Sequence, residues 1–313
     1  MTTYDESLHP RGQAGNAGQY RAKLNAAPTG ELDGVQLPIF TPDDVRNADH
    51  TIDVIREHIL TGDVDNFREV ESDEDGNTVV EWEWKSRYFG ADTTYRERAT
   101  IDDRGEILGR QSQGPGGHWF AADMHGDEAM VLRMKVNEAR LAMAGVLIHG
   151  QPNDGGPYGR KFVGGRVDQS STGWVNATNV SAAVRKHIAA AIEWGALPAE
   201  YEYRVKTSKF SGGQAVDITV EGMPDSKHFA ERQEGFPHGQ SAHVREVNEV
   251  LKTIGEQWNT DASDTMTDYF DVTYYLSVQV DDEHMTRFRA AQREIAATKR
   301  KAKKDAALKG AAA

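Results

Sequence analysis

The chain has 313 residues, of which 38% are hydrophobic, and a formal net charge of −13, a length and composition that predict two domains with polar tails. The absence of cysteine excludes disulfides, thiolate zinc sites, iron–sulfur clusters and a cysteine nucleophile. An apolar run of the roughly 18 residues that span a membrane and an apolar signal core are both missing, so we expect a soluble cytoplasmic protein without a membrane partner.

The first residues show no periodic spacing of apolar side chains. Residues 1–35 mix Gly, Ala, Pro and polar residues without a helical or strand period, which predicts a flexible arm. An acidic α+β domain is expected over residues 36–148. It opens with a helix, because Thr41 is a suitable N-cap and Pro42 suits the first helical position. Gly62 should end this helix.

Alternating apolar and polar residues then predict an antiparallel β-meander over about residues 66–110. Trp82 and Trp84 alternate with Glu81 and Glu83. The tryptophans are expected in the core, because an aromatic stripe that faces a sheet partner buries much apolar area. Pairing with the next strand would place basic residues beside the two glutamates, namely Arg96 and Arg98.

Acidic residues concentrate on this meander and its turns, and they form a candidate partner-binding surface. Two interpretations stay open. The carboxylates could imitate DNA phosphates and occupy a host DNA-binding protein, or they could form a solubilising surface. The candidate residues are Asp73, Glu74, Asp75, Glu81, Glu83, Asp102 and Asp103.

A helix is expected from Asp127 to about Ala144, because acids stand at its start and basic residues follow. Its methionines should pack in the core, with a Met-rich binding groove as the alternative. These residues are Met130, Met134 and Met143.

Residues 149–173 form a Gly-rich linker or loop between the two domains, and its length suggests a functional or disordered segment. It lacks the residue order of a phosphate-binding loop, so a mobile surface loop is the alternative to an anion site. The candidate anion-binding residues are Gly156, Gly159, Arg160 and Lys161.

Residues 174–285 predict a second domain with the element order α-β-β-α-β, in which helices cover one face of a small sheet. The expected elements are a helix over 180–194 capped by Asn179, strands over 201–207 and 215–221, a helix over 241–258 and a strand over 272–280. The fold class is therefore α+β.

The last segment, residues 286–313, predicts a basic, alanine-rich helical tail. Nine of the 36 Lys and Arg residues lie from Arg287 onward, where only two of the 49 acidic residues occur. An acidic body repels phosphates, so nucleic-acid binding is expected only through this tail. Its candidate residues are Lys299, Arg300, Lys301, Lys303 and Lys304.

Four phrases within residues 179–280 carry a family resemblance: Tyr-Arg-Val at 203–205, Ser-Gly-Gly at 211–213, Val-Asp-Ile-Thr-Val at 216–220 and Asp-Tyr-Phe-Asp-Val-Thr at 268–273. The segment resembles one of the large-polyvalent-protein-associated domains of actinobacterial phages and plasmids. The resemblance covers about a third of the chain. It implies an accessory protein of a mobile element inside a bacterial host, and it supplies no catalytic residues.

No arrangement of residues in the sequence identifies a reaction. The nucleophile elbow of serine hydrolases is missing. His238 and His243 stand five residues apart, which does not match a metal pair on a helix, and His118, Asp123 and His125 lack a second ligand pair. We therefore expect no catalytic residue, no metal and no cofactor.

These observations lead to one hypothesis and two alternatives. The hypothesis is a non-enzymatic accessory protein of a phage or other mobile element that binds host or element proteins, with counter-defence through the acidic surface. A structural component of a virion or nucleoprotein is the first alternative. An enzyme that uses the loop at 149–173 is the second.

Overall fold

The computed structural model of the chain describes residues 40–60, 64–70, 72–86, 93–113, 116–121, 127–149, 152–153, 161–167, 176–230, 239–261, 263 and 272–311. Within these residues the fold is mixed α and β, which confirms the predicted class. The predicted flexible arm lies outside them. In the described part of the chain, none of the helices combines the length and the apolar character needed to cross a membrane.

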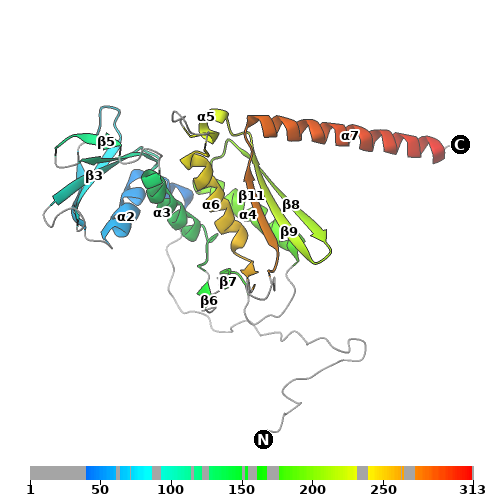
Figure 1. The fold of residues 1–313 in the computed structure, drawn as a ribbon, viewed down its shortest axis with the longest axis horizontal. Coiled ribbons are helices and arrows are strands. Elements are labelled where there is room, and N and C mark those ends of the chain that lie inside the picture. Colours follow the sequence, from blue (N-terminus) through cyan, green and yellow to red (C-terminus); the bar gives the residue numbers. More distant parts are fainter. Residues whose placement is uncertain are drawn as a thin grey trace, which may run out of the picture.

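Five antiparallel strands form the sheet of the N-terminal half, and they are hydrogen-bonded in chain order (Figure 1). The strands are β1 (Val64–Val70), β2 (Thr78–Ser86), β3 (Thr93–Ile101), β4 (Ile107–Gln113) and β5 (Trp119–Ala121). The helices of this half are α1 (Pro42–Val45), α2 (Ala48–Leu60) and α3 (Asp127–Met143). The predicted meander is confirmed, and the structure adds a short fifth strand, β5, that was not predicted.

The core of this half lies between the sheet and the helices α2 and α3. Because side chains alternate across a strand, one face of β2 carries the apolar residues. Trp82 is buried there against Ile55 of α2 and Leu132 of α3. Trp84 is half-buried at the margin, where its ring stacks on Tyr95 with 4.7 Å between ring centroids. The prediction of core tryptophans is thus confirmed fully for Trp82 and partly for Trp84.

The helix predicted from Thr41 is two helices. The Asp44 carboxylate accepts hydrogen bonds from the backbone N–H and the hydroxyl of Thr41, both at 2.7 Å, which stabilises the start of α1. The chain then turns at Arg46. The Asn47 side chain accepts a hydrogen bond from the His50 backbone N–H at 2.8 Å. Asn47 therefore caps a new helix, and the prediction of one continuous helix was wrong.

The C-terminal half contains a three-stranded sheet in the order β11-β9-β8 (Figure 1). Its elements are α4 (Ala177–Glu193), β8 (Glu202–Phe210), β9 (Gly213–Glu221), α5 (Asp225–His228), α6 (Ala242–Glu256) and β11 (Tyr275–Val280). Strands β8 and β9 are antiparallel, whereas β9 and β11 are parallel. Helices α4 and α6 cover one face, where Val184, Ile218 and Leu251 are buried together. The predicted order of helices and strands is confirmed.

Some boundaries differ from the predictions. The Asn176 side chain accepts a hydrogen bond from the Thr178 backbone N–H at 3.0 Å, so Asn176 rather than Asn179 caps α4. Strands β8 and β9 extend to a tight turn, which Gly212 permits with its φ of +94°. Strand β11 starts at Tyr275, later than predicted.

Part of the predicted linker joins a third, small sheet. Strands β6 (Pro152–Asn153), β7 (Lys161–Val163) and β10 (Thr260–Asp261) are arranged in the order β10-β7-β6. After β7, Gly164 packs so closely on the end of α6 that a Cβ atom would lie 2.2 Å from the Glu256 backbone oxygen. The described residues 161–167 are therefore held by strand pairing and close packing on the C-terminal half.

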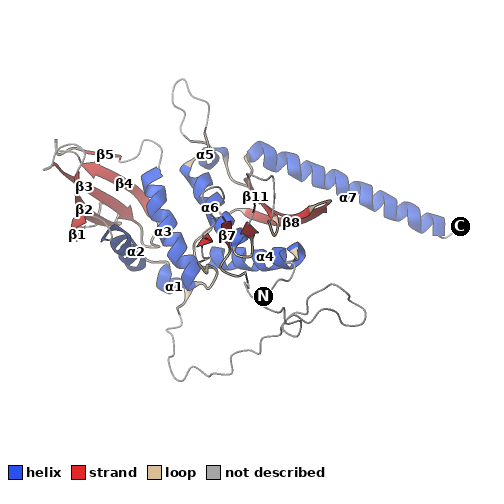
Figure 2. Ribbon diagram, turned by 60° about the horizontal axis from the view of Figure 1, so that its bottom comes forward, coloured by secondary structure: helices blue, strands red, loops and turns tan. Residues whose placement is uncertain are grey.

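Helix α3 joins the two halves, because it lies between the N-terminal sheet and α6 (Figure 2). Its Arg133 forms an ion pair with Glu246 of α6 at 2.7 Å, and its Asn137 donates to the same carboxylate at 2.9 Å. The Glu246 carboxylate thus binds two side chains that lie one helical turn apart on α3.

Helix α7 (Glu283–Ala311) is 29 residues long and extends away from the rest of the molecule (Figure 1). It begins earlier than predicted, because the Asp282 carboxylate accepts a hydrogen bond from the Met285 backbone N–H at 2.7 Å and caps its first turn. The predicted basic helical tail is confirmed as a helix.

Candidate functional site

Two buried carboxylates hold the start of α7 on the C-terminal sheet. Glu221 ends β9 and Asp281 follows β11, and the two parallel strands bring these residues to the same edge. Arg289 Nε lies 2.5 Å from Asp281 Oδ2 in an ion pair, and Arg293 donates two hydrogen bonds to Glu221 at 2.6 and 2.7 Å. The side chain of Asp281 is 0% exposed and that of Glu221 is 4% exposed, so the carboxylate of each ion pair is shielded from water.

The pKa of Glu221 reflects these ion pairs, which we call the anchor of α7. Burial by itself raises the pKa of Glu221, but the hydrogen bonds and charge of Arg293, followed by Arg204, outweigh burial and bring that pKa below its usual value. Glu221 is therefore ionised at neutral pH. Its bidentate contact with Arg293 is a charge-assisted pair of fixed geometry, and it orients the helix as well as holding it.

The spacing of the two arginines sets the direction of α7. Arg289 and Arg293 stand one helical turn apart, about 6 Å along the axis. They bind neighbouring strands, which lie about 4.8 Å apart. Helix α7 must therefore run across the strands, from β11 over β9 toward the edge strand β8. Figure 1 shows that the C-terminal part of α7 projects past the sheet.

The projecting part of α7 carries the predicted basic tail residues. We call residues 299–304 the basic arm. The side chains of Lys299, Arg300, Lys301 and Lys303 are exposed, and none of these four forms an ion pair with another residue that the structure describes. Lys304 lies in the same helix, and its side chain is outside the description. The basic arm therefore presents at least these four cations to the solvent.

The sheet face opposite α4 and α6 lies next to the base of α7, and we call it the open face. The strand register arranges its side chains in rows. The row nearest the helix contains Gln279, Thr219 and Arg204, and the next contains Ser277, Asp217 and Lys206. At the far end lie two exposed aromatic rings, Phe210 and Tyr275, whose centroids are 5.8 Å apart.

The predicted acidic surface divides into turn residues and strand residues. Asp73 accepts hydrogen bonds from two backbone N–H groups of its own turn at 3.0 and 2.8 Å, and Asp102 does the same at 3.0 and 2.7 Å. These two carboxylates shape the hairpin turns. The remaining turn acids are exposed, and they are Glu74, Asp75 and Asp103.

The strand acids of this surface lie beside cations. The predicted register is confirmed, with Glu83 opposite Arg96 and Glu81 opposite Arg98. Glu83 pairs with Arg96 at 2.7 Å, whereas Glu81 pairs with Arg68 of β1 at 2.9 Å. Arg98 instead donates to a glutamine of β4 at 2.6 Å. The strand carboxylates are thus part of a charge-balanced ladder.

The candidate anion-binding loop is described only at its end. Gly156, Gly159 and Arg160 lie outside the described residues. Lys161 opens β7, and its side chain is also outside the description. An anion site in this loop therefore stays a prediction.

An apolar groove of about 450 Å³ lies beside the contact between α3 and α6 and is lined by residues of both helices. Met130 and Met134 of α3 line it together with Leu147 and Val250, and both methionines are half-buried. Met130 and Met134 therefore line a groove and do not fill a closed core, whereas Met143 is not part of its lining, and a binding role for the groove stays a prediction.

Titratable side chains also gather at the start of α6. The Tyr201 hydroxyl lies 2.9 Å from His243 Nε2, and Lys227 binds Glu200 at 3.2 Å. Burial, with a smaller contribution from the Lys227 charge, lowers the pKa of His243, which favours the neutral imidazole beside the Tyr201 hydroxyl. Across the residues that the structure describes, no three His, Asp or Glu side chains are grouped to hold a metal.

Comparison of the chain with protein-family models, with curated proteins and with solved structures gave no match. The resemblance of residues 179–280 to a mobile-element domain therefore stays a prediction.

The sequence reasoning missed the anchor of α7. A signal for it was present, because Glu221 and Asp281 stand at the ends of two strands predicted for one sheet. The tail also places Arg289 and Arg293 at the spacing of one helical turn. Opposite charges at a shared strand edge and on one helix face indicate a docked helix.

Proposed function

We propose that this chain is a non-enzymatic binding protein whose basic arm contacts the phosphate backbone of nucleic acid without reading its sequence. The observation that carries the proposal is the fixed projection of α7, which presents the exposed cations of the basic arm beyond the sheet edge. The accessory role in a phage or other mobile element, expected from the resemblance, is the biological setting of this proposal.

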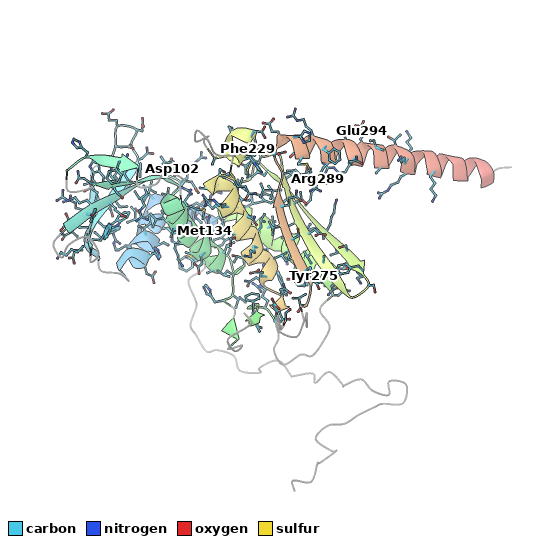
Figure 3. All side chains as sticks on the ribbon, in the orientation of Figure 1. Asp102, Met134, Phe229, Tyr275, Arg289 and Glu294 are labelled. Carbon is cyan, nitrogen blue, oxygen red and sulfur yellow. The ribbon has the colours of Figure 1, made fainter. Side chains whose placement is uncertain are left out.

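Rigidity supports the proposal. A flexible basic tail loses conformational entropy when it binds, whereas a helix that is already formed and anchored loses less. Arg289 and Arg293 hold the base of α7 through shielded ion pairs, so the arm keeps its direction relative to the body. The acidic N-terminal meander lies at the other end of the molecule, where Figure 3 marks Asp102, and it does not neutralise the arm within one chain.

The acidic surface offers a weaker basis for function than the arm. A phosphate mimic needs a fixed array of free carboxylates, but Glu81 and Glu83 lie in ion pairs with Arg68 and Arg96. Asp73 accepts hydrogen bonds from its own turn. A partner would have to displace cations that the sheet itself supplies, which reduces the charge available for recognition.

The test is the salt dependence of binding to labelled double-stranded DNA, measured by fluorescence anisotropy. Contacts from all five basic residues of the arm predict a slope of log K against log salt of about −4.5. Replacing Lys299, Lys301 and Lys303 with Gln keeps good helix propensity and removes up to three contacts, so the slope should become shallower by about 2.7.

The matched control changes three exposed lysines of the body to Gln. These are Lys85, Lys186 and Lys252, which lie outside α7. This variant has the same change in net charge and should keep the affinity and slope of the unaltered protein. Equal weakening by the two triple variants would mean that overall charge, not the arm, controls binding, and absence of DNA binding by the unaltered protein would refute the proposal.

A further inference from the structure

The open face ends in an exposed aromatic pair that the core does not need. Phe210 is 50% exposed and Tyr275 is 46% exposed, and their rings are inclined by 40°. They come from β8 and β11, on either side of β9. Figure 3 shows Tyr275 at the end of the sheet opposite to Arg289 at the base of α7. Large exposed rings on an otherwise polar sheet face indicate a contact surface.

The backbone beneath the rings is shaped to let them approach each other. Gly213 of β9 lies in register with Phe210, and a Cβ atom on Gly213 would come within 3.1 Å of both the Phe210 and Tyr275 rings. Any other residue at this position would push against the two rings. The missing side chain therefore allows the pair to close over β9 as one platform.

The open face leads from this platform to the basic arm. Gly213 and Glu221 are the two ends of β9, and the eight residue-to-residue steps between them span about 26 Å. Lys206 lies on the open face between them, and Lys209 is exposed near the hairpin tip. A chain that stacks on the platform can thus run along the face toward the arm, where its phosphates meet the cations.

We propose that the open face binds single-stranded RNA, with bases stacked on Phe210 and Tyr275 and the phosphate backbone led toward the basic arm. This inference rests on the proposed function, because the arm supplies most of the charge. A single strand is required, since paired bases in a duplex do not expose their faces to aromatic side chains.

The middle of the open face favours ribose over deoxyribose. Asp217 lies there in register with Ser277 on β11 and Lys206 on β8. A carboxylate repels phosphate, but it accepts a hydrogen bond from a 2′-hydroxyl, which only RNA has. Ser277 in the same row and Thr219 in the row nearest the helix add hydroxyl groups, which both donate and accept hydrogen bonds as a ribose requires.

The experiment compares three labelled probes by fluorescence anisotropy with the full chain: oligouridylate, oligothymidylate and double-stranded DNA. The unaltered protein should bind oligouridylate more tightly than oligothymidylate, and both more tightly than the duplex at the same salt. The double variant Phe210→Thr with Tyr275→Thr keeps strand-forming residues, and it should weaken oligouridylate binding about tenfold or more. Its affinity for the duplex should not change.

Two further variants keep the result interpretable. Exchange of the rings, Phe210→Tyr with Tyr275→Phe, keeps both aromatic faces and should retain the affinity for oligouridylate. The control Leu108→Thr with Phe120→Thr removes apolar residues of similar exposure from the N-terminal sheet and should leave all three affinities unchanged.

The outcomes separate this inference from the proposed function. Equal affinity for oligouridylate and oligothymidylate, or no effect of the double threonine variant, would overturn the single-stranded RNA site and leave the duplex contact of the arm intact. Failure of the unaltered protein to bind any of the three probes would overturn both. If the circular dichroism of the threonine variant shows that it is not folded, the ring-exchange variant becomes the test. Loss of oligouridylate binding by that variant would then overturn the inference.

Discussion

Replacing Arg140 with Met tests how the two halves of the molecule are held together. Arg140 lies in α3 and is only 1% exposed. Its guanidinium donates to the backbone carbonyls of Val45 and Gly195 at 3.3 and 2.9 Å, and to the Glu106 carboxylate at 2.9 Å. These acceptors lie in α1, just after α4, and in the turn between β3 and β4, so one side chain joins three segments.

The expected magnitude follows from the groups that the substitution leaves behind. Met has a similar length but no donor, so the Val45 and Gly195 carbonyls lose this partner, at about 1–3 kcal/mol each if they stay buried. Removal of the buried charge offsets part of this loss, because the guanidinium no longer needs to be desolvated. We expect the free energy of unfolding to fall by about 3 kcal/mol, a large share of the roughly 5–15 kcal/mol that a typical domain has.

Urea denaturation followed by circular dichroism and tryptophan fluorescence measures this change. Tryptophan side chains lie in both halves, among them Trp82 in the N-terminal core and Trp258 beside the C-terminal core, so fluorescence reports on both. Arg104→Met is the control, because Arg104 is exposed in the neighbouring turn and its replacement should change stability by less than about 0.5 kcal/mol. If the urea midpoint of Arg140→Met equals that of the control, the hydrogen bonds of Arg140 do not stabilise the fold as argued.

Two further predictions concern pH and packing. Burial lowers the pKa of four histidines, so the unfolded chain takes up protons first as the pH falls below about 6.5, and stability should decrease from pH 7 toward pH 5. A urea midpoint that does not change or that is higher at pH 5 would contradict this. The four residues are His50, His58, His187 and His243, and His243→Gln should reduce the pH dependence. Gly164→Ala forces a Cβ atom against the Glu256 backbone oxygen and should destabilise the protein by about 1–3 kcal/mol, whereas Gly109→Ala, with open space around it, should be close to neutral in thermal unfolding. Equal melting temperatures for the two alanine variants would show that α6 can move away from residue 164.

Periodicity and turn residues in the sequence were sufficient to predict most of the elements. The alternation around Trp82 predicted β2 and its register with β3, because a period of two leaves only one face for the core. The helical period at 241–258 predicted α6, and in the structure the Ser241 hydroxyl caps that helix by accepting a hydrogen bond from the Val244 backbone N–H at 3.1 Å. Local signals failed where two candidates compete, as at Asn176 and Asn179, since either asparagine can cap a helix.

The sequence by itself therefore determined the α+β class, the order of elements in both halves and the basic character of the last helix, because these depend on residues close to one another in the chain. It did not determine which charges are free. Arg293 and Lys299 belong to the same basic segment, yet only the tertiary structure pairs Arg293 with Glu221, 72 residues away, and leaves Lys299 exposed. In the same way, the sequence predicted Arg96 and Arg98 beside Glu81 and Glu83, and the structure pairs Glu81 with Arg68 of β1 instead. Partners distant in sequence decide whether a charge is structural or available, because ion pairing depends on separation in space and not along the chain.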